Sequence, residues 1–96
     1  MSNRGVICAE LMERREQQDV QYGGEQHDDA HVLNDWVVLV SRYATDAAPN
    51  PVCKHDLDYS PEDLARFRHR MLDAAALAMA AIESLDRRFP NAKHGS

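Results

Sequence analysis

The residues from Ser60 to Pro90 constrain the fold more than any other part of the chain. Ser60 can cap a helix, Pro61 suits the first helical position, and two acidic residues follow where the helix dipole favours negative charge. Pro90 then ends the segment, because proline disfavours a helical residue before it. Between these signals, apolar side chains recur at three- and four-residue spacing: Leu64, Phe67, Met71, Ala74, Ala75, Ala78, Ile82, Leu85 and Phe89. The pattern predicts one long helix over residues 61–89.

Two shorter helices are predicted before this segment. Residues 3–19 combine a partial apolar stripe with strong helix formers, and the two glycines that follow favour a helix stop. Residues 30–47 carry a broad apolar face at helical spacing, and we expect Asp28 or Asp29 to be the N-cap of this second helix. The proline-containing residues 48–60 are predicted to be a loop.

Together these segments predict an all-α fold, formed by a single domain over residues 1–96. The second and third helices should form an antiparallel hairpin that the first helix covers. The last helix, at about 1.5 Å per residue, is longer than either neighbour can cover. We therefore expect a small bundle of three helices that a homodimer completes.

Composition restricts the classes of partner. The chain of 96 residues has a net charge of −5, which disfavours nucleic-acid binding because that function requires a basic surface. No apolar run reaches the length of a membrane span, and the charged N-terminus lacks the apolar core of a signal peptide. Cys8 and Cys53 are too few for a disulfide scaffold, so we expect a cytoplasmic protein with reduced thiols. Cys53 lies beside Lys54 and His55, but neighbours along a loop rarely form an activated-thiol site.

Clustered carboxylates make a divalent metal site the leading chemical hypothesis. At 100° per residue, Asp28, His31 and Asp35 fall within about 60° of one another on a helix, at the edge of its apolar face. Glu83 and Asp86 lie one turn apart beside the seam of the last helix. These oxygen-rich ligands would suit Mg²⁺ or Mn²⁺.

The same residues also have a structural interpretation. Asp28 could be only a helix cap, and His31 a solvated residue at the helix edge. Glu83 stands four residues before Arg87, at the spacing of an ordinary helical ion pair. The sequence leaves the two interpretations open.

Three further residues are candidates for contact with a nucleotide. Arg68 and Arg42 could neutralise phosphates, although either could be a surface ion-pair partner. Trp36 is either part of the core or a platform on which a nucleobase stacks.

Three motifs resemble known proteins. "ERREQ" at residues 13–17, "HDDAH" at residues 27–31 and the closing "AIESLDR" are similar to a group of small phage and prophage proteins of unassigned activity. More remotely, the acidic helices look like the MazG-type all-α nucleotide pyrophosphohydrolases, which hold a metal with E-x-x-E on one helix and E-x-x-D on the next. "ESLD" matches the second motif at Glu83 and Asp86. The first is matched only by "ELME" at residues 10–13, so Asp28, His31 and Asp35 would have to replace it.

This resemblance implies a helical-bundle oligomer that hydrolyses nucleoside triphosphates with Mg²⁺. The metal would lower the pKa of an attacking water. His31 or a carboxylate would take the proton, and Arg68 would steady the departing pyrophosphate. Four carboxylates would hold the metal: Asp28, Asp35, Glu83 and Asp86.

The alternative is a phage accessory or anti-defence protein that binds without catalysis in the host cytoplasm. A groove would sequester a nucleotide or a nucleotide signal through Arg68, Arg42 and Trp36. The acidic surface could instead occupy a basic face of a host defence protein, because complementary charge speeds association.

Overall fold

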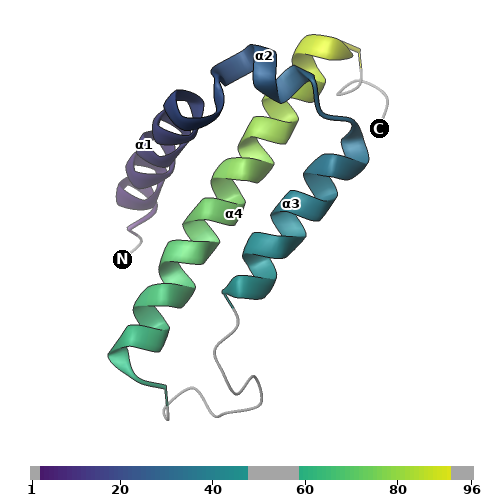
Figure 1. Ribbon diagram of the computed structural model, residues 1–96. Coiled ribbons are helices and arrows are strands. Elements are labelled where there is room, and N and C mark those ends of the chain that lie inside the picture. The colour runs from purple at the N-terminus through teal and green to yellow at the C-terminus, as the bar shows by residue number, and fades with distance from the viewer. Residues whose placement is uncertain (1–2, 48–58, 92–96) are drawn as a thin grey trace.

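The computed structural model describes residues 3–47 and 59–91, and within these ranges the chain is all-α, as predicted. It forms α1 (Arg4–Tyr22), α2 (Gly24–Asp29), α3 (Leu33–Asp46) and α4 (Pro61–Arg88), with no strand in the described ranges (Figure 1). The loop predicted over residues 48–60 falls mainly on residues 48–58, outside the described part, and so does the thiol hypothesis for Cys53.

α4 is the central helix of the molecule. α1 and α3 pack along two sides of α4 and not on each other, while α2 crosses the end of α4 (Figure 1). α3 runs antiparallel to α4, which confirms the predicted hairpin. At the end of this hairpin where α3 begins and α4 finishes, the Arg88 guanidinium donates a 2.7 Å hydrogen bond to the His31 carbonyl.

The start of α4 confirms the predicted capping signals. The Ser60 hydroxyl accepts a 3.1 Å hydrogen bond from the Asp63 backbone N–H, and the Asp63 carboxylate accepts one of 3.3 Å from the Ser60 N–H. Pro61 occupies the first turn, as predicted. The helix ends at Arg88, one residue before the predicted limit.

The second predicted helix begins later than the sequence indicated. α1 continues three residues past the predicted end and stops at Gly23, whose φ of 98° lies in the left-handed region that glycine tolerates. The "HDDAH" motif then forms the second half of α2 and the turn after it, and α3 starts only at Leu33.

The prediction that Asp28 or Asp29 caps this helix is therefore wrong. The N-cap of α3 is Val32, which has an extended backbone conformation. The Asp35 carboxylate accepts a 3.1 Å hydrogen bond from the Val32 N–H and so satisfies one donor at the helix start. Asp28 and Asp29 instead bind side chains of α1 and α4, described below.

The core is small. Trp36 of α3 packs against Leu77 and Ala80 of α4, and half-buried residues surround them: Leu39, Val40, Tyr43 and Ala81. Most of the other fully buried apolar residues are alanines, which let α3 approach α4 closely. Much of the predicted α4 seam remains exposed, including Leu64 and Phe67.

Candidate ligand-binding groove

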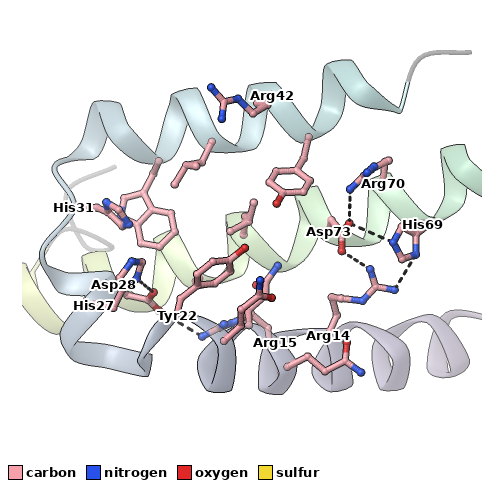
Figure 2. Close-up of a pocket in the computed structure, with 18 residues that line it drawn as sticks. Arg14, Arg15, Tyr22, His27, Asp28, His31, Arg42, His69, Arg70 and Asp73 are labelled. Carbon is pink, nitrogen blue, oxygen red and sulfur yellow. Dashed lines mark hydrogen bonds and ion pairs between the residues drawn. The ribbon is translucent and has the colours of Figure 1, made fainter. Parts of the chain in front are cut away.

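A groove of about 620 Å³ lies between α1, α3 and α4 (Figure 2). Such a volume is within the range of small-ligand sites. Because the backbones of α1 and α3 both pack on α4 but not on each other, the space between them stays open above α4. Its lining is rich in arginine, histidine, glutamine and aromatic side chains: Arg14, Arg15, Gln17, Gln18, Gln21, Tyr22, His27, Asp28, His31, Trp36, Leu39, Arg42, Tyr43, His69, Arg70, Asp73, Leu77 and Ala80.

One end of the groove is a cationic cluster around a single carboxylate. Figure 2 shows Arg14, His69 and Arg70 converging on Asp73. Arg14 forms an ion pair with Asp73, Arg70 lies 3.4 Å from its Oδ2, and His69 Nε2 lies 3.7 Å from the same atom. Asp73 is only 8% exposed. Since two arginines share one carboxylate, this end keeps a net positive charge.

Arg15 occupies the floor of the groove and ties three elements together. Its Nε donates a 2.9 Å hydrogen bond to Glu83 of α4, and its Nη2 lies 3.0 Å from Asp19 and 3.7 Å from Asp28. Burial opposes the charged form of Arg15, but the hydrogen bond to Glu83 and the nearby carboxylates outweigh this effect and raise the pKa of Arg15 above its ordinary value. This buried arginine is compensated within the fold and has a structural role.

The other end is lined by a ladder of rings. Tyr22 stacks on His27 with centroids 5.8 Å apart, and His27 meets His31 edge-on at 4.8 Å. His31 then meets Trp36 edge-on at 5.0 Å. A hydrogen bond with Tyr22 and partial burial raise the pKa of Tyr43 above its ordinary value of 10.0, so these two tyrosines link α1 to α3.

Two buried polar atoms in the lining residues lack a hydrogen-bond partner within the described ranges. They are Trp36 Nε1 and Gln18 Oε1. Trp36 is 4% exposed, so its N–H has no easy access to bulk water. A buried polar group without a partner costs about 1–3 kcal/mol.

The predicted metal ligands do not come together. Asp28 and Glu83 both bind Arg15, whereas Asp35 caps α3 and lies 3.7 Å from His31 Nδ1. Asp86 makes no ion pair with another described residue. Over residues 3–47 and 59–91, no group of three or more His, Cys, Asp or Glu side chains could hold a metal ion. The prediction that Asp28 and Asp35 lie on one helical face was wrong, because the helix is interrupted between α2 and α3.

Of the three predicted nucleotide contacts, two line the groove. Trp36 and Arg42 do, and Arg42 is exposed with no ion pair to another described side chain. Arg68 lies outside the groove, where it donates two hydrogen bonds of 2.6 and 2.7 Å to Glu10 of α1. These bonds raise the pKa of Arg68 and lower that of Glu10 from 4.5.

Sequence reasoning missed the cationic cluster. Arg14 and Asp73 are 59 residues apart, and Arg14 and His69 are 55 apart. No spacing along the chain indicates such contacts. The only local signal was the pair of arginines inside "ERREQ".

The fold and the groove define an all-α protein with a pocket that is cationic at one end and aromatic at the other. Comparison of the chain with protein-family models, with curated proteins and with solved structures finds no match. None of the helices in the described ranges has the length and apolar character needed to cross a membrane.

Proposed function

We propose that this protein binds a nucleotide-type ligand, an organic anion with a planar ring, and holds it without chemical conversion. The observation that carries the proposal is one groove that joins the Arg14–His69–Arg70 cluster to the ring ladder of Tyr22, His27, His31 and Trp36.

The charge of the groove supports an anionic ligand. The whole chain is acidic, with a net charge of −5. Apart from the compensated Arg15 and its partner Asp28, the lining nevertheless holds three arginines against one aspartate, Asp73. A cleft of one sign concentrates its field and attracts the opposite charge. An anionic ligand would therefore be attracted to the groove, although the net negative charge of the protein repels anions elsewhere.

The rings support a planar group on the same ligand. Aromatic and histidine rings contribute base-stacking surface worth about 1–3 kcal/mol per base. The exposed amides of Gln17 and Gln21 in the lining offer directional hydrogen bonds, which distinguish one heterocycle from another. A phosphate at the cationic end and a base at the ring end would match the two ends of the groove.

The carboxylate contacts favour binding over metal-dependent hydrolysis. Mg²⁺ coordination would require Asp28 and Glu83 to leave Arg15, a buried cation that would then lose its compensation. Sequestration of a nucleotide or a nucleotide signal, the role expected of a phage-type accessory protein, needs no such rearrangement.

The test uses the intrinsic fluorescence of Trp36, the only tryptophan of the chain. Adenosine and guanosine mono-, di- and triphosphates and a cyclic dinucleotide would be titrated with Mg²⁺ and with EDTA. We expect at least one nucleotide to quench the signal equally in both buffers, with no pyrophosphate released. Quenching that requires Mg²⁺ and is followed by pyrophosphate release would establish the hydrolase instead, and no quenching by any nucleotide would overturn the proposal.

A matched pair of variants locates the site. Arg42→Gln removes an exposed arginine of the groove, and Arg66→Gln removes an exposed arginine of α4 that does not line it. We expect Arg42→Gln to weaken binding roughly tenfold, about 1.4 kcal/mol, and Arg66→Gln to leave it unchanged. Equal effects of the two would mean that the chain attracts nucleotides only through general charge.

A further inference from the structure

We infer that a second copy of this chain docks on an exposed apolar stripe of α4 and forms an antiparallel homodimer in which α4 packs on α4. The stripe consists of Leu64, Phe67, Met71, Ala75, Ala78 and Ile82. The large members are 39–58% exposed, Ala75 is exposed, and Ala78 is half-buried.

The stripe is one straight face of the helix. At 100° per residue, its six members fall within about 80° of one another, and they extend about 27 Å along α4. Asp73 and Ala80, which line the binding groove, lie roughly on the opposite side of the same helix. A partner on the stripe would therefore leave the groove open.

The balance of buried and exposed apolar groups indicates an incomplete core. In the described ranges three large apolar side chains are buried, those of Trp36, Leu72 and Leu77, whereas fourteen are exposed. Monomeric proteins rarely leave a contiguous apolar face of this kind in water. A helix face with apolar residues at three- and four-residue spacing is the seam that a helical partner covers.

The order of side chains along the stripe points to a second copy. Bulky residues stand at both ends and the small Ala75 and Ala78 stand in the middle. With a two-fold axis between these alanines, Ala75 meets Ala78 of the other copy and Met71 meets Ile82, so residues 71–82 are complementary to themselves. Leu64 then lies opposite Phe89 of the other copy, which is 47% exposed. Self-complementarity is the requirement of a two-fold interface.

A shallow apolar hollow next to the stripe provides a matching contact. It has a volume of about 320 Å³ and lies between α3 and α4, where Val37, Val40, Ala81 and Ile82 line it. In the antiparallel arrangement Met71 of the second copy reaches this hollow. Flexible methionine side chains fill irregular apolar spaces of this kind.

The available area is sufficient for a dimer. Together with the hollow on the side of α3, the stripe gives a face about 27 Å long and two helices, about 20 Å, wide. This face covers roughly 500 Å² on each copy, or roughly 1,000 Å² in total, which is close to the lower limit of specific interfaces. The stripe itself carries no charge, so two acidic copies can meet there without direct repulsion.

Sedimentation equilibrium at micromolar concentration tests the association. We expect the wild type to have twice the monomer mass of 10.9 kDa. Ile82→Lys places a charge in the interface and should prevent association. The new lysine can pair with Asp86 one turn later, so α4 should remain helical and the variant should sediment as a folded monomer. Val20→Lys, at an 88% exposed position of α1, should remain a dimer. A monomeric wild type, or an Ile82→Lys variant that stays dimeric, would overturn the inference.

Disulfide cross-linking tests the orientation of the two helices. With Cys8 and Cys53 replaced by serine, Ala75→Cys lies near the two-fold axis and should form a covalent dimer on mild oxidation. Leu64→Cys should not, because antiparallel packing separates the two copies of this position by about 37 Å at 1.5 Å per residue. Cross-linking through Leu64→Cys would demonstrate a parallel dimer and contradict the proposed geometry.

Discussion

Asp73 is the residue on which the proposed binding site depends most. Among the described residues it is the only carboxylate shared by Arg14 and Arg70, and it lies at the end of the groove where an anionic ligand would bind. The carboxylate therefore has two opposed effects. It compensates two arginines in the free protein, and it repels the anion that those arginines would attract.

Replacing Asp73 with asparagine should separate these two effects. We expect the free energy of unfolding to fall by about 1–3 kcal/mol, because the arginines lose a charged acceptor. We also expect affinity for a nucleotide to rise roughly tenfold, since one like charge is removed from the site. Urea denaturation and the Trp36 titration measure the two quantities.

Asp86→Asn is the matched control for this experiment. Asp86 is on the same helix but outside the groove, and it pairs with no arginine of the described part. This variant should change neither the nucleotide affinity nor the stability by a comparable amount. If Asp73→Asn weakens nucleotide binding while the protein stays folded, the cationic cluster is not the anion-binding end of the groove.

At the scale of the elements, ion pairs attach α1 and α2 to α4. Glu10 of α1 binds Arg68 of α4, and Asp29 of α2 binds Arg87, whose Nη2 lies 2.8 Å from Asp29 Oδ1. The Ser84 hydroxyl donates a further 2.7 Å hydrogen bond to Asp29. These contacts compensate for the shortage of buried apolar surface between α1, α2 and α4.

The same contacts predict a loss of stability in acid. Hydrogen bonds from Arg87 and Ser84 lower the pKa of Asp29 below 3.8, and the bond from Arg68 lowers that of Glu10 below 4.5. Because both carboxyl groups have a lower pKa in the folded than in the unfolded protein, the unfolded chain binds protons first as the pH falls. The stabilisation is complete above these ordinary values and is lost as the pH drops through the lowered ones.

Urea denaturation at a series of pH values checks this prediction. The variant with Arg68→Gln and Arg87→Gln should lose less stability than the wild type between neutral pH and acid below 3.8. Glu16→Gln, which removes a carboxylate with no ion pair in the described ranges, should retain the wild-type slope. Identical slopes for all three proteins would show that these ion pairs do not control acid unfolding.

At the scale of the whole molecule, the small core links stability to assembly. If two copies bury the α4 stripe, the folded state is the dimer and the unfolded state is the monomer. Mass action then makes stability depend on protein concentration. A monomeric bundle with this core would lack that dependence.

Thermal unfolding at several protein concentrations should show this effect. We expect the Tm of the wild type to rise with concentration and that of Ile82→Lys to be lower and constant. Circular dichroism at the helical minimum provides the measurement, and Val20→Lys should behave as the wild type. A wild-type Tm that is independent of concentration would contradict a dimer coupled to folding.

The sequence by itself determined the features that depend on neighbours along the chain. Ser60, Pro61 and Asp63 predicted the start of α4, and the glycines after Tyr22 predicted the end of α1 to within three residues. Apolar periodicity predicted the all-α fold and the α3–α4 hairpin. Capping, proline geometry and periodicity act over a few residues, so they can be recognised without the tertiary structure.

Only the tertiary structure decided how the charged residues pair. Within "HDDAH", Asp28 and Asp29 had the spacing of helix caps or metal ligands, but Arg15, Ser84 and Arg87 bind their side chains from other helices. These contacts hold "HDDAH" in α2 and the following turn and separate Asp28 from Asp35. The packing of α1 on α4 likewise brings Arg14 to Asp73 at one end of the groove. In every such contact between α4 and α1 or α2, the two residues are 55 or more positions apart in the sequence. No local pattern can specify these pairs, because the packing of α1 and α2 on α4 decides which side chains meet.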